Sequence, residues 1–232
     1  MAPVLTELKA LRELLFPVHC FGCNKLGIEV CSQCRKNWHP HFYRQNFGDL
    51  EVYSSIRYSS TAKSILLSAK EDSVRLADEL IIDALHNCLR RLPSSILRHA
   101  VLLPIPGSKR ANRKRGRDFI LEITKQLSIR SGVPILTGLK INRTLLDQSR
   151  LNAADRSRNI SGAFEFKAKL SESSEQGGSG DFKDLNREIL LVDDLVTSGA
   201  TLLEAKRAIF ASGFRANRAI TACVAQTLNI GR

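Results

Sequence analysis

The second half of the chain alternates between apolar runs and helical patterns. Four segments have the composition of strands, the first and third being compact and almost wholly apolar: 100–105, 133–139, 188–192 and 219–225. Between them, apolar residues with a helical spacing occupy 119–127 and 202–212. Strands that alternate with helices in this way predict a parallel α/β sheet with right-handed crossovers and helices on its faces.

The first hundred residues follow a different pattern. Apolar residues spaced three and four apart predict a short amphipathic helix over 4–15, and further strand or helix patterns lie at 50–58, 61–68 and 73–92. Residues 18–38 are polar and rich in cysteine, and they lack the apolar residues that a core needs. We therefore predict a small N-terminal unit of residues 1–45 and an α/β domain of residues 46–232.

Composition excludes several classes of protein. The chain has 232 residues, of which 43% are hydrophobic and 25% charged, a balance typical of a globular protein. No uncharged apolar run approaches the roughly 20 residues of a membrane-spanning helix. Glu7, Lys9 and Arg12 interrupt the apolar residues near the N-terminus, unlike those of a secretory signal. We therefore expect no transmembrane segment and a cytoplasmic location.

The net charge is +12, from 35 Lys and Arg against 23 Asp and Glu. This excess predicts a polyanionic partner: nucleic acid, an anionic membrane surface or a phosphorylated small molecule. Much of it lies in residues 101–160, which contain 13 basic and 4 acidic residues. Within them, residues 107–117 contain six basic residues and no acid. This segment is either a solvated helix start or a contact for phosphate groups.

The cysteines suggest a metal site near the N-terminus. Two C-x-x-C pairs separated by seven residues can supply four thiolates to one tetrahedral Zn²⁺: Cys20, Cys23, Cys31 and Cys34. A zinc ion would also supply the cross-link that residues 18–38 need in order to fold. The alternatives are a redox pair or four unrelated cysteines. Cys88 and Cys223 lie in apolar segments and are expected to be buried, whereas His19, His39 and His41 are expected outside the sulfur sphere.

The segment 189–201 gives the strongest chemical signal. A hydrophobic strand brings Asp193 and Asp194 to its carboxyl end, where ligands bind in parallel sheets. Small and hydroxyl residues follow at 197–201, and their amides at a helix start can hold a phosphate dianion. The carboxylates suit the vicinal hydroxyls of a ribose, or Mg²⁺. Phosphate and diol together describe a 5-phosphoribosyl group. The alternative is an ordinary helix cap by Thr197 or Ser198.

These motifs resemble known sequences. Residues 189–201 closely resemble the phosphoribosyl-pyrophosphate (PRPP) loop of type I phosphoribosyltransferases. Residues 143–164 contain Arg…Gln…Leu…Arg-x-x-Asn-x-x-Gly-Ala-Phe, and residues 14–23 read Leu-Leu-Phe-Pro-x-x-Cys-x-x-Cys. With Lys70 after the first helix, the pattern resembles the ComF family of phosphoribosyltransferase-like proteins, which are linked to competence and DNA uptake and have GntX-type relatives. Residues 115–119 read Arg-Gly-Arg-Asp-Phe where that family usually has Arg-Gly-Phe-Asn-Gln.

The resemblance implies a type I phosphoribosyltransferase-like parallel sheet flanked by helices, with a small N-terminal zinc knuckle of four cysteines. It makes Asp193 and Asp194 the ribose contacts, and it implies a structural zinc ion and Mg²⁺ with PRPP. The implied phosphate contacts are Thr197, Ser198, Gly199, Ala200 and Thr201 for the 5′-phosphate, and Lys109 and Arg110 for the diphosphate. Further contacts to pyrophosphate or DNA are implied for Lys70, Arg113, Lys114, Arg115, Arg143, Gln148, Arg156 and Asn159. Residues 143–161 are otherwise a charged surface loop, or a loop that closes over the sugar.

Three functions agree with these observations. The first is an accessory protein of competence and DNA uptake, which binds PRPP, single-stranded DNA and proteins of the uptake machinery. The second is a catalytic phosphoribosyltransferase that transfers the sugar of PRPP to a nitrogenous acceptor. The third is a regulator that senses a nucleotide without turnover, since a fold does not determine a function. The sequence favours the first and does not identify an acceptor.

Overall fold

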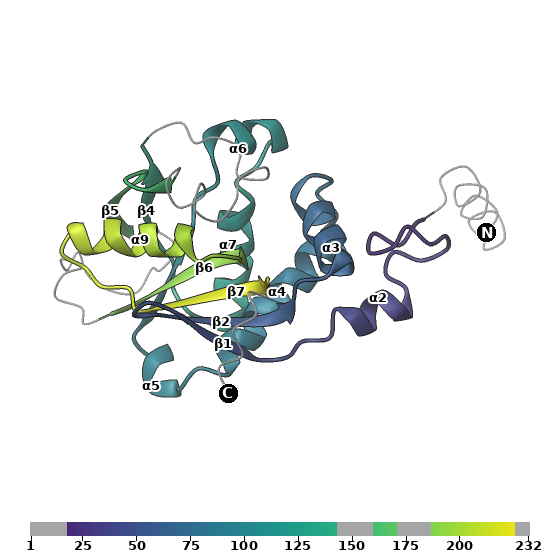
Figure 1. Cartoon of the computed structure of the whole chain (residues 1–232), viewed down its shortest axis with the longest axis horizontal. Coiled ribbons are helices and arrows are strands. Elements are labelled where there is room, and N and C mark those ends of the chain that lie inside the picture. The colour runs from purple at the N-terminus through teal and green to yellow at the C-terminus, as the bar shows by residue number, and fades with distance from the viewer. Residues whose placement is uncertain (1–17, 143–159, 171–186, 226–232) are drawn as a thin grey trace, which may run out of the picture.

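A five-stranded sheet forms the centre of the molecule in the computed structural model, which describes residues 18–142, 160–170 and 187–225 (Figure 1). Its strands, in spatial order, are β1 (Tyr43–Phe47), β2 (Leu50–Arg57), β7 (Arg218–Val224), β6 (Glu188–Val196) and β3 (Ala100–Pro104). The last four are mutually parallel, and β1 runs antiparallel to β2 at one edge. The predicted α/β class with a mainly parallel sheet is therefore confirmed.

The central strands are apolar along their whole length because both faces of the sheet are covered. All five residues of β3 are buried. Leu102 packs into the core on one face, while Val101 and Leu103 pack into the core on the other. This is the pattern expected of a parallel strand buried on both faces, and it explains why the compact run at 100–105 could be recognised from sequence.

Three helices cover the first face of the sheet. They are α3 (Ser60–Lys70), α4 (Arg75–Arg90) and α7 (Phe119–Ser131). The apolar stripe of α4 supplies Ala77, Ile81 and Leu85 to this core. The predicted helices are confirmed, with ends that differ by a few residues. A short helix, α5 (Ser94–Leu97), connects α4 to β3 and was not predicted, since four residues carry no periodic signal.

The second face is covered by α9 (Ala200–Ala211) and by a hairpin of β4 (Leu136–Ile141) and β5 (Phe164–Leu170). The prediction of a sheet strand over 133–139 is wrong in part. Only Ile135 bridges to the sheet, at Leu102, and β4 then turns away to pair antiparallel with β5. Gly138 makes this pairing possible, because a Cβ there would lie 1.7 Å from the carbonyl oxygen of Lys167.

Besides α5 and β5, the strand β1 and the helix α2 (Ser32–Asn37) also escaped the sequence analysis. The edge strand β1 has alternating polar residues without an apolar run, and α2 lies within the cysteine-rich segment. Neither has the apolar periodicity from which elements are recognised. The predictions for residues 4–15, 143–159 and 171–181 lie outside the described residues. No helix among the described residues is long and apolar enough to cross a membrane.

Candidate functional site

The two aspartates lie within β6, which continues to Val196, beyond the predicted 188–192. The regular alternation of side chains between the two faces of the sheet is interrupted at the aspartates. Val192 and Leu195 are three residues apart, yet both pack against the core beneath α3, α4 and α7. Regular alternation would place them on opposite faces. The pairing with β7 passes over Asp194, and pairing between β7 and β2 passes over Ser55 at the same level. Asp194 therefore leaves the regular ladder.

Asp194 meets Lys70, the last residue of α3. The Lys70 Nζ atom lies 2.6 Å from Oδ2 of Asp194, and the Asp194 side chain is only 7% exposed. The neighbouring Asp193 turns its Oδ1 back to accept a hydrogen bond of 2.9 Å from the Asp194 amide. The sequence analysis expected the carboxylates at the ribose and Lys70 at pyrophosphate or DNA, whereas the structure pairs Lys70 directly with Asp194.

Burial and neighbouring charges shift the pKa values of Asp193 and Lys70. Desolvation raises the pKa of Asp193 well above its ordinary value, and the negative charge of Asp194 raises it further. Desolvation would lower the pKa of Lys70, but attraction to Asp194 outweighs it and raises that pKa. Lys70 therefore keeps its positive charge, while Asp193 holds a proton more readily than an exposed aspartate does.

The turn after β6 leaves the start of α9 without a cap. Gly199, at φ +74°, precedes the helix, and no side chain accepts a hydrogen bond from its first turn. The alternative in which Thr197 or Ser198 caps α9 is therefore wrong. Among the described residues, none accepts a hydrogen bond from the amides of residues 198–202. Consecutive unpaired amides at the N-terminus of a twelve-residue helix form a favourable place for an anion.

An aromatic ring that the sequence analysis missed supports this turn. A Cβ on Gly199 would lie 2.4 Å from Cδ1 of Phe47, at the end of the edge strand β1. Glycine is therefore required both by the left-handed backbone and by the ring beside it. Phe47 is separated from the turn by about 150 residues of sequence, and no local pattern could have indicated the contact.

The loop after β3 begins at the same edge of the sheet. The amide of Ile105 donates to the carbonyl oxygen of Val192, 2.9 Å away, so this loop starts beside the strand that carries the aspartates. Residues Lys109–Arg115 then form a short helix, α6, capped by Ser108. Lys109 and Arg110 are exposed at its start, and within the described part of the chain no carboxylate lies within ion-pair distance of either.

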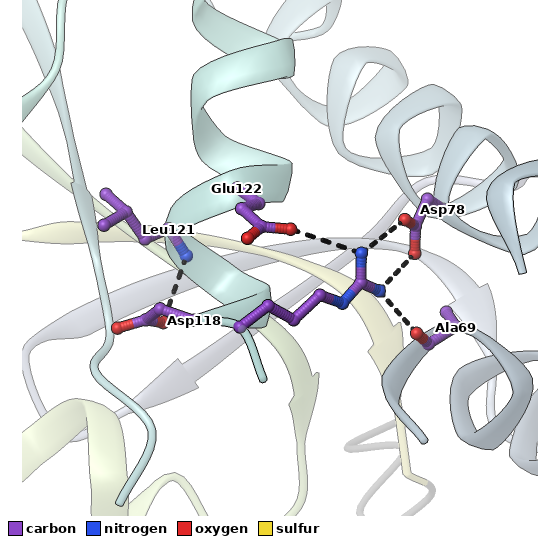
Figure 2. A network of polar contacts seen from close by, with 6 residues as sticks. Ala69, Asp78, Asp118, Leu121 and Glu122 are labelled. Carbon is purple, nitrogen blue, oxygen red and sulfur yellow. Dashed lines mark hydrogen bonds and ion pairs between the residues drawn. The ribbon is translucent and has the colours of Figure 1, made fainter. Parts of the chain in front are cut away.

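Three of the six basic residues at 107–117 form ion pairs within the protein and are not free to bind a ligand phosphate. Arg117 donates both terminal nitrogens to Asp78 at 2.8 Å and also contacts Glu122 and the carbonyl oxygen of Ala69 (Figure 2). The guanidinium thereby contacts α3 through Ala69, α4 through Asp78 and α7 through Glu122. Asp118, the next residue, caps α7 by accepting from the amide of Leu121. The basic charge of Arg117 is thus used to join helices.

Two more members of the cluster are neutralised by one carboxylate. Arg115 binds Glu71 at 2.8 Å, and Lys114 lies 3.6 Å from the same side chain. The hydrogen bond from Arg115 holds the pKa of Glu71 below its usual value. Lys109, Arg110 and Arg113 are the exposed cations of residues 107–117 without an acidic partner among the described residues. The predicted contacts Arg143, Gln148, Arg156 and Asn159 lie outside the described residues.

The four cysteines of the predicted knuckle lie together. Their Sγ atoms are all within 4.8 Å of one another, and those of Cys23 and Cys31 are 3.7 Å apart. Four ligands at a Zn–S distance of about 2.3 Å have sulfurs roughly 3.8 Å apart, so the donor set fits tetrahedral zinc. Burial opposes ionisation of Cys20, but amides from Cys31 and Gly22 lower the pKa of its thiol to about 6.

The knuckle packs against the helices of the first face. Cys20, Val30, Cys31 and Cys34 form a small core that contacts Leu76 and Leu80 of α4. Trp38 donates its indole N–H to the carbonyl oxygen of Leu80, and Asn37 binds Thr61 at the start of α3. Figure 1 shows this unit at the end of the molecule beyond α3. The helix that ends at Lys70 therefore begins on the knuckle.

The remaining cysteines and histidines lie as predicted. Cys88 and Cys223 are buried, and burial raises the pKa of Cys88 to about 12, which makes it unreactive. His19, His39 and His41 are exposed. The rings of His39 and His41 lie 5.4 Å apart, and that of Tyr43 follows 6.1 Å from His41.

No protein-family model and no curated protein matches the chain. Among solved structures, orotate phosphoribosyltransferase from Aeropyrum pernix is similar, with a TM-score of 0.36 and 11% sequence identity. The match covers 70% of this chain and 64% of the orotate phosphoribosyltransferase chain, which is less than two thirds of that protein's length. Adenine phosphoribosyltransferase from Leishmania tarentolae has a TM-score of 0.38 and 11% identity, over 78% of this chain and 94% of that one. Both likenesses are distant.

Proposed function

We propose that this chain binds a 5-phosphoribosyl ligand, such as PRPP, where β6 meets α9. One observation carries the proposal: residues 193–202 place two adjacent carboxylates next to a helix start whose amides have no acceptor among the described residues. Carboxylate oxygens accept hydrogen bonds from a ribose diol, and the amides can donate to a phosphate dianion. Lys109 and Arg110, exposed at the start of α6, could contact a diphosphate.

Calorimetry with ribose 5-phosphate tests the proposal. We expect the full chain to bind ribose 5-phosphate more tightly than 2-deoxyribose 5-phosphate, because loss of one hydroxyl leaves a carboxylate without its partner and costs about 1–3 kcal/mol. Asp193→Ala is expected to weaken binding about tenfold, or about 1.4 kcal/mol. Asp83→Ala, at an exposed position on α4, is the matched control and should bind as the wild type does. Equal affinity for both sugars would contradict the diol contact.

A catalytic phosphoribosyltransferase is the second function that this site supports. A nitrogen of the acceptor would form a bond to C1 of PRPP as the bond from C1 to the diphosphate oxygen breaks. Lys109 and Arg110, which have no acidic partner among the described residues, favour this reading because they can stabilise the departing diphosphate, on which Mg²⁺ would supply further charge. Release of pyrophosphate in the presence of candidate bases measures this activity directly.

Binding of single-stranded DNA forms a further part of the proposal, together with a cytoplasmic role in DNA uptake. The exposed cations Lys109, Arg110 and Arg113 support it, since none has an acidic partner among the described residues. Three phosphates neutralised by these side chains would give log K against log salt a slope of about −2.

This charge contribution can be measured by fluorescence anisotropy with labelled oligothymidine between low and physiological salt. We expect the double variant Arg110→Gln/Arg113→Gln to make the slope shallower by about 1.4, because two phosphate contacts are lost. The double variant Arg35→Gln/Lys36→Gln removes the same charge from α2 and serves as the control. An unchanged slope in the first variant would exclude α6 as a DNA contact.

A further inference from the structure

A lysine side chain, that of Lys70, lies beside the Asp193–Asp194 pair. Lys70 Nζ lies 2.6 Å from Oδ2 of Asp194, and the Lys70 side chain is 25% exposed. The Lys70 ammonium also lies 5.8 Å from the centroid of the Phe119 ring, within the range of a cation–π interaction. The ammonium is thus held within the site, in contrast to the exposed cations at the start of α6.

Two adjacent carboxylates at a phosphate site ordinarily suit a divalent cation such as Mg²⁺, which the sequence analysis expected with PRPP. Here one oxygen of each carboxylate is already engaged, that of Asp194 through an ion pair that lacks hydrogen-bond geometry. Oδ2 of Asp194 faces Lys70, and Oδ1 of Asp193 accepts from the Asp194 amide. A Mg²⁺ ion on this pair would have to displace an ammonium at 2.6 Å and would bring two positive charges beside it. The residues present do not fit a metal ion at this position.

We propose that Lys70 is the resident cation of the Asp193–Asp194 pair and excludes divalent metal ions from it. The charge of Asp194 is balanced without a metal ion, so the pair can accept hydrogen bonds from a sugar in Mg²⁺-free solution. The consequence for ligand binding rests on the proposed function, whereas the exclusion of metal ions does not. Any Mg²⁺ that accompanies PRPP would then be held by the diphosphate.

The first measurement uses Mn²⁺ as the probe, without a sugar. Electron paramagnetic resonance of free Mn²⁺ is measured with the full chain in buffer freed of divalent ions by resin, so that no chelator disturbs the knuckle. The variant Lys70→Met keeps a side chain of similar length and removes its charge. We expect it to bind Mn²⁺ at least tenfold more tightly than the wild type. Lys63→Met, at an exposed position on the same helix, should match the wild type. Equal Mn²⁺ binding by Lys70→Met and the wild type would overturn the proposal.

The second measurement is calorimetry with ribose 5-phosphate, with and without 5 mM MgCl₂ (a level of about 5 mM is ample for a weak Mg²⁺ site). We expect less than a threefold effect of Mg²⁺ on the wild type and at least a tenfold requirement for Mg²⁺ in Lys70→Met. A tenfold requirement in the wild type would overturn the proposal. If no variant binds the sugar while Lys70→Met gains the Mn²⁺ site, the proposed function fails and the role of Lys70 stands. Lys70→Gln repeats both measurements if Lys70→Met does not fold.

Discussion

Replacing Cys34 by serine is expected to abolish stoichiometric zinc binding and to unfold the knuckle. The four sulfurs fit a tetrahedral site, and structural zinc contributes about 10–16 kcal/mol of apparent binding free energy in small domains near neutral pH. Because the knuckle core contacts Leu76 and Leu80, we expect the loss to destabilise the packing of α4 as well. Metal analysis of the purified chain and urea unfolding with and without a zinc chelator measure both effects.

The control for this experiment is Cys88→Ser. Cys88 is buried beside Ser55, outside the knuckle, so its replacement should leave the zinc content unchanged. Binding should also weaken as the pH falls, because the thiols must lose their protons to hold the metal. A Cys34→Ser protein that retains one zinc per chain, or a wild type whose unfolding is insensitive to the chelator, would contradict the zinc site.

Arg117→Met is expected to lower the free energy of unfolding by about 3–5 kcal/mol, because it leaves a largely buried carboxylate without its partner. The side chains of Arg117 and Asp78 are only 14% and 17% exposed, and the pair joins α7 to α4. The variant also removes the hydrogen bond to the carbonyl oxygen of Ala69 on α3. Equilibrium unfolding in urea gives the change in free energy directly.

A matched variant separates this effect from a general loss of charge. Arg130→Met removes the ion pair with Asp83, whose side chains are 36% and 62% exposed, and should cost less than about 1 kcal/mol. The double variant Arg117→Met/Asp78→Leu should recover most of the stability, since no charge is then left buried. A cost below about 1 kcal/mol for Arg117→Met alone would show that the contacts in Figure 2 contribute little to stability.

The elements that could be predicted from sequence are those whose pattern is local. The runs in β3 and β6 are apolar because each strand is covered on both faces, and the stripe on α4 repeats at helical spacing because one side packs on the sheet. The strand predicted over 133–139 does not join the main sheet but pairs with β5, which the sequence analysis did not predict. Its departure from the sheet depends on Gly138 and on a partner strand about 25 residues away in the sequence.

In the candidate site too, features with a local sequence pattern could be predicted and contacts between distant segments could not. The aspartates, the glycine turn and the four cysteines have recognisable spacings, and the structure brings Lys70 to Asp194 from another helix. What the sequence could not show is how charges are paired in space. Arg117 looks like its basic neighbours, yet it binds Asp78 from a distant segment, and Phe47 supports Gly199 across the fold. Such pairings depend on tertiary packing, which has no signature in a single sequence.

The binding of a phosphorylated pentose where β6 meets α9 is tested most directly by following backbone amides. Two-dimensional ¹H–¹⁵N spectra of the full chain are recorded during titration with ribose 5-phosphate. We expect the largest shifts at the amides of residues 198–202, which have no acceptor among the described residues, and accompanying shifts at Asp193 and Asp194. Amides that stay unchanged at these positions at saturating sugar phosphate would contradict the account.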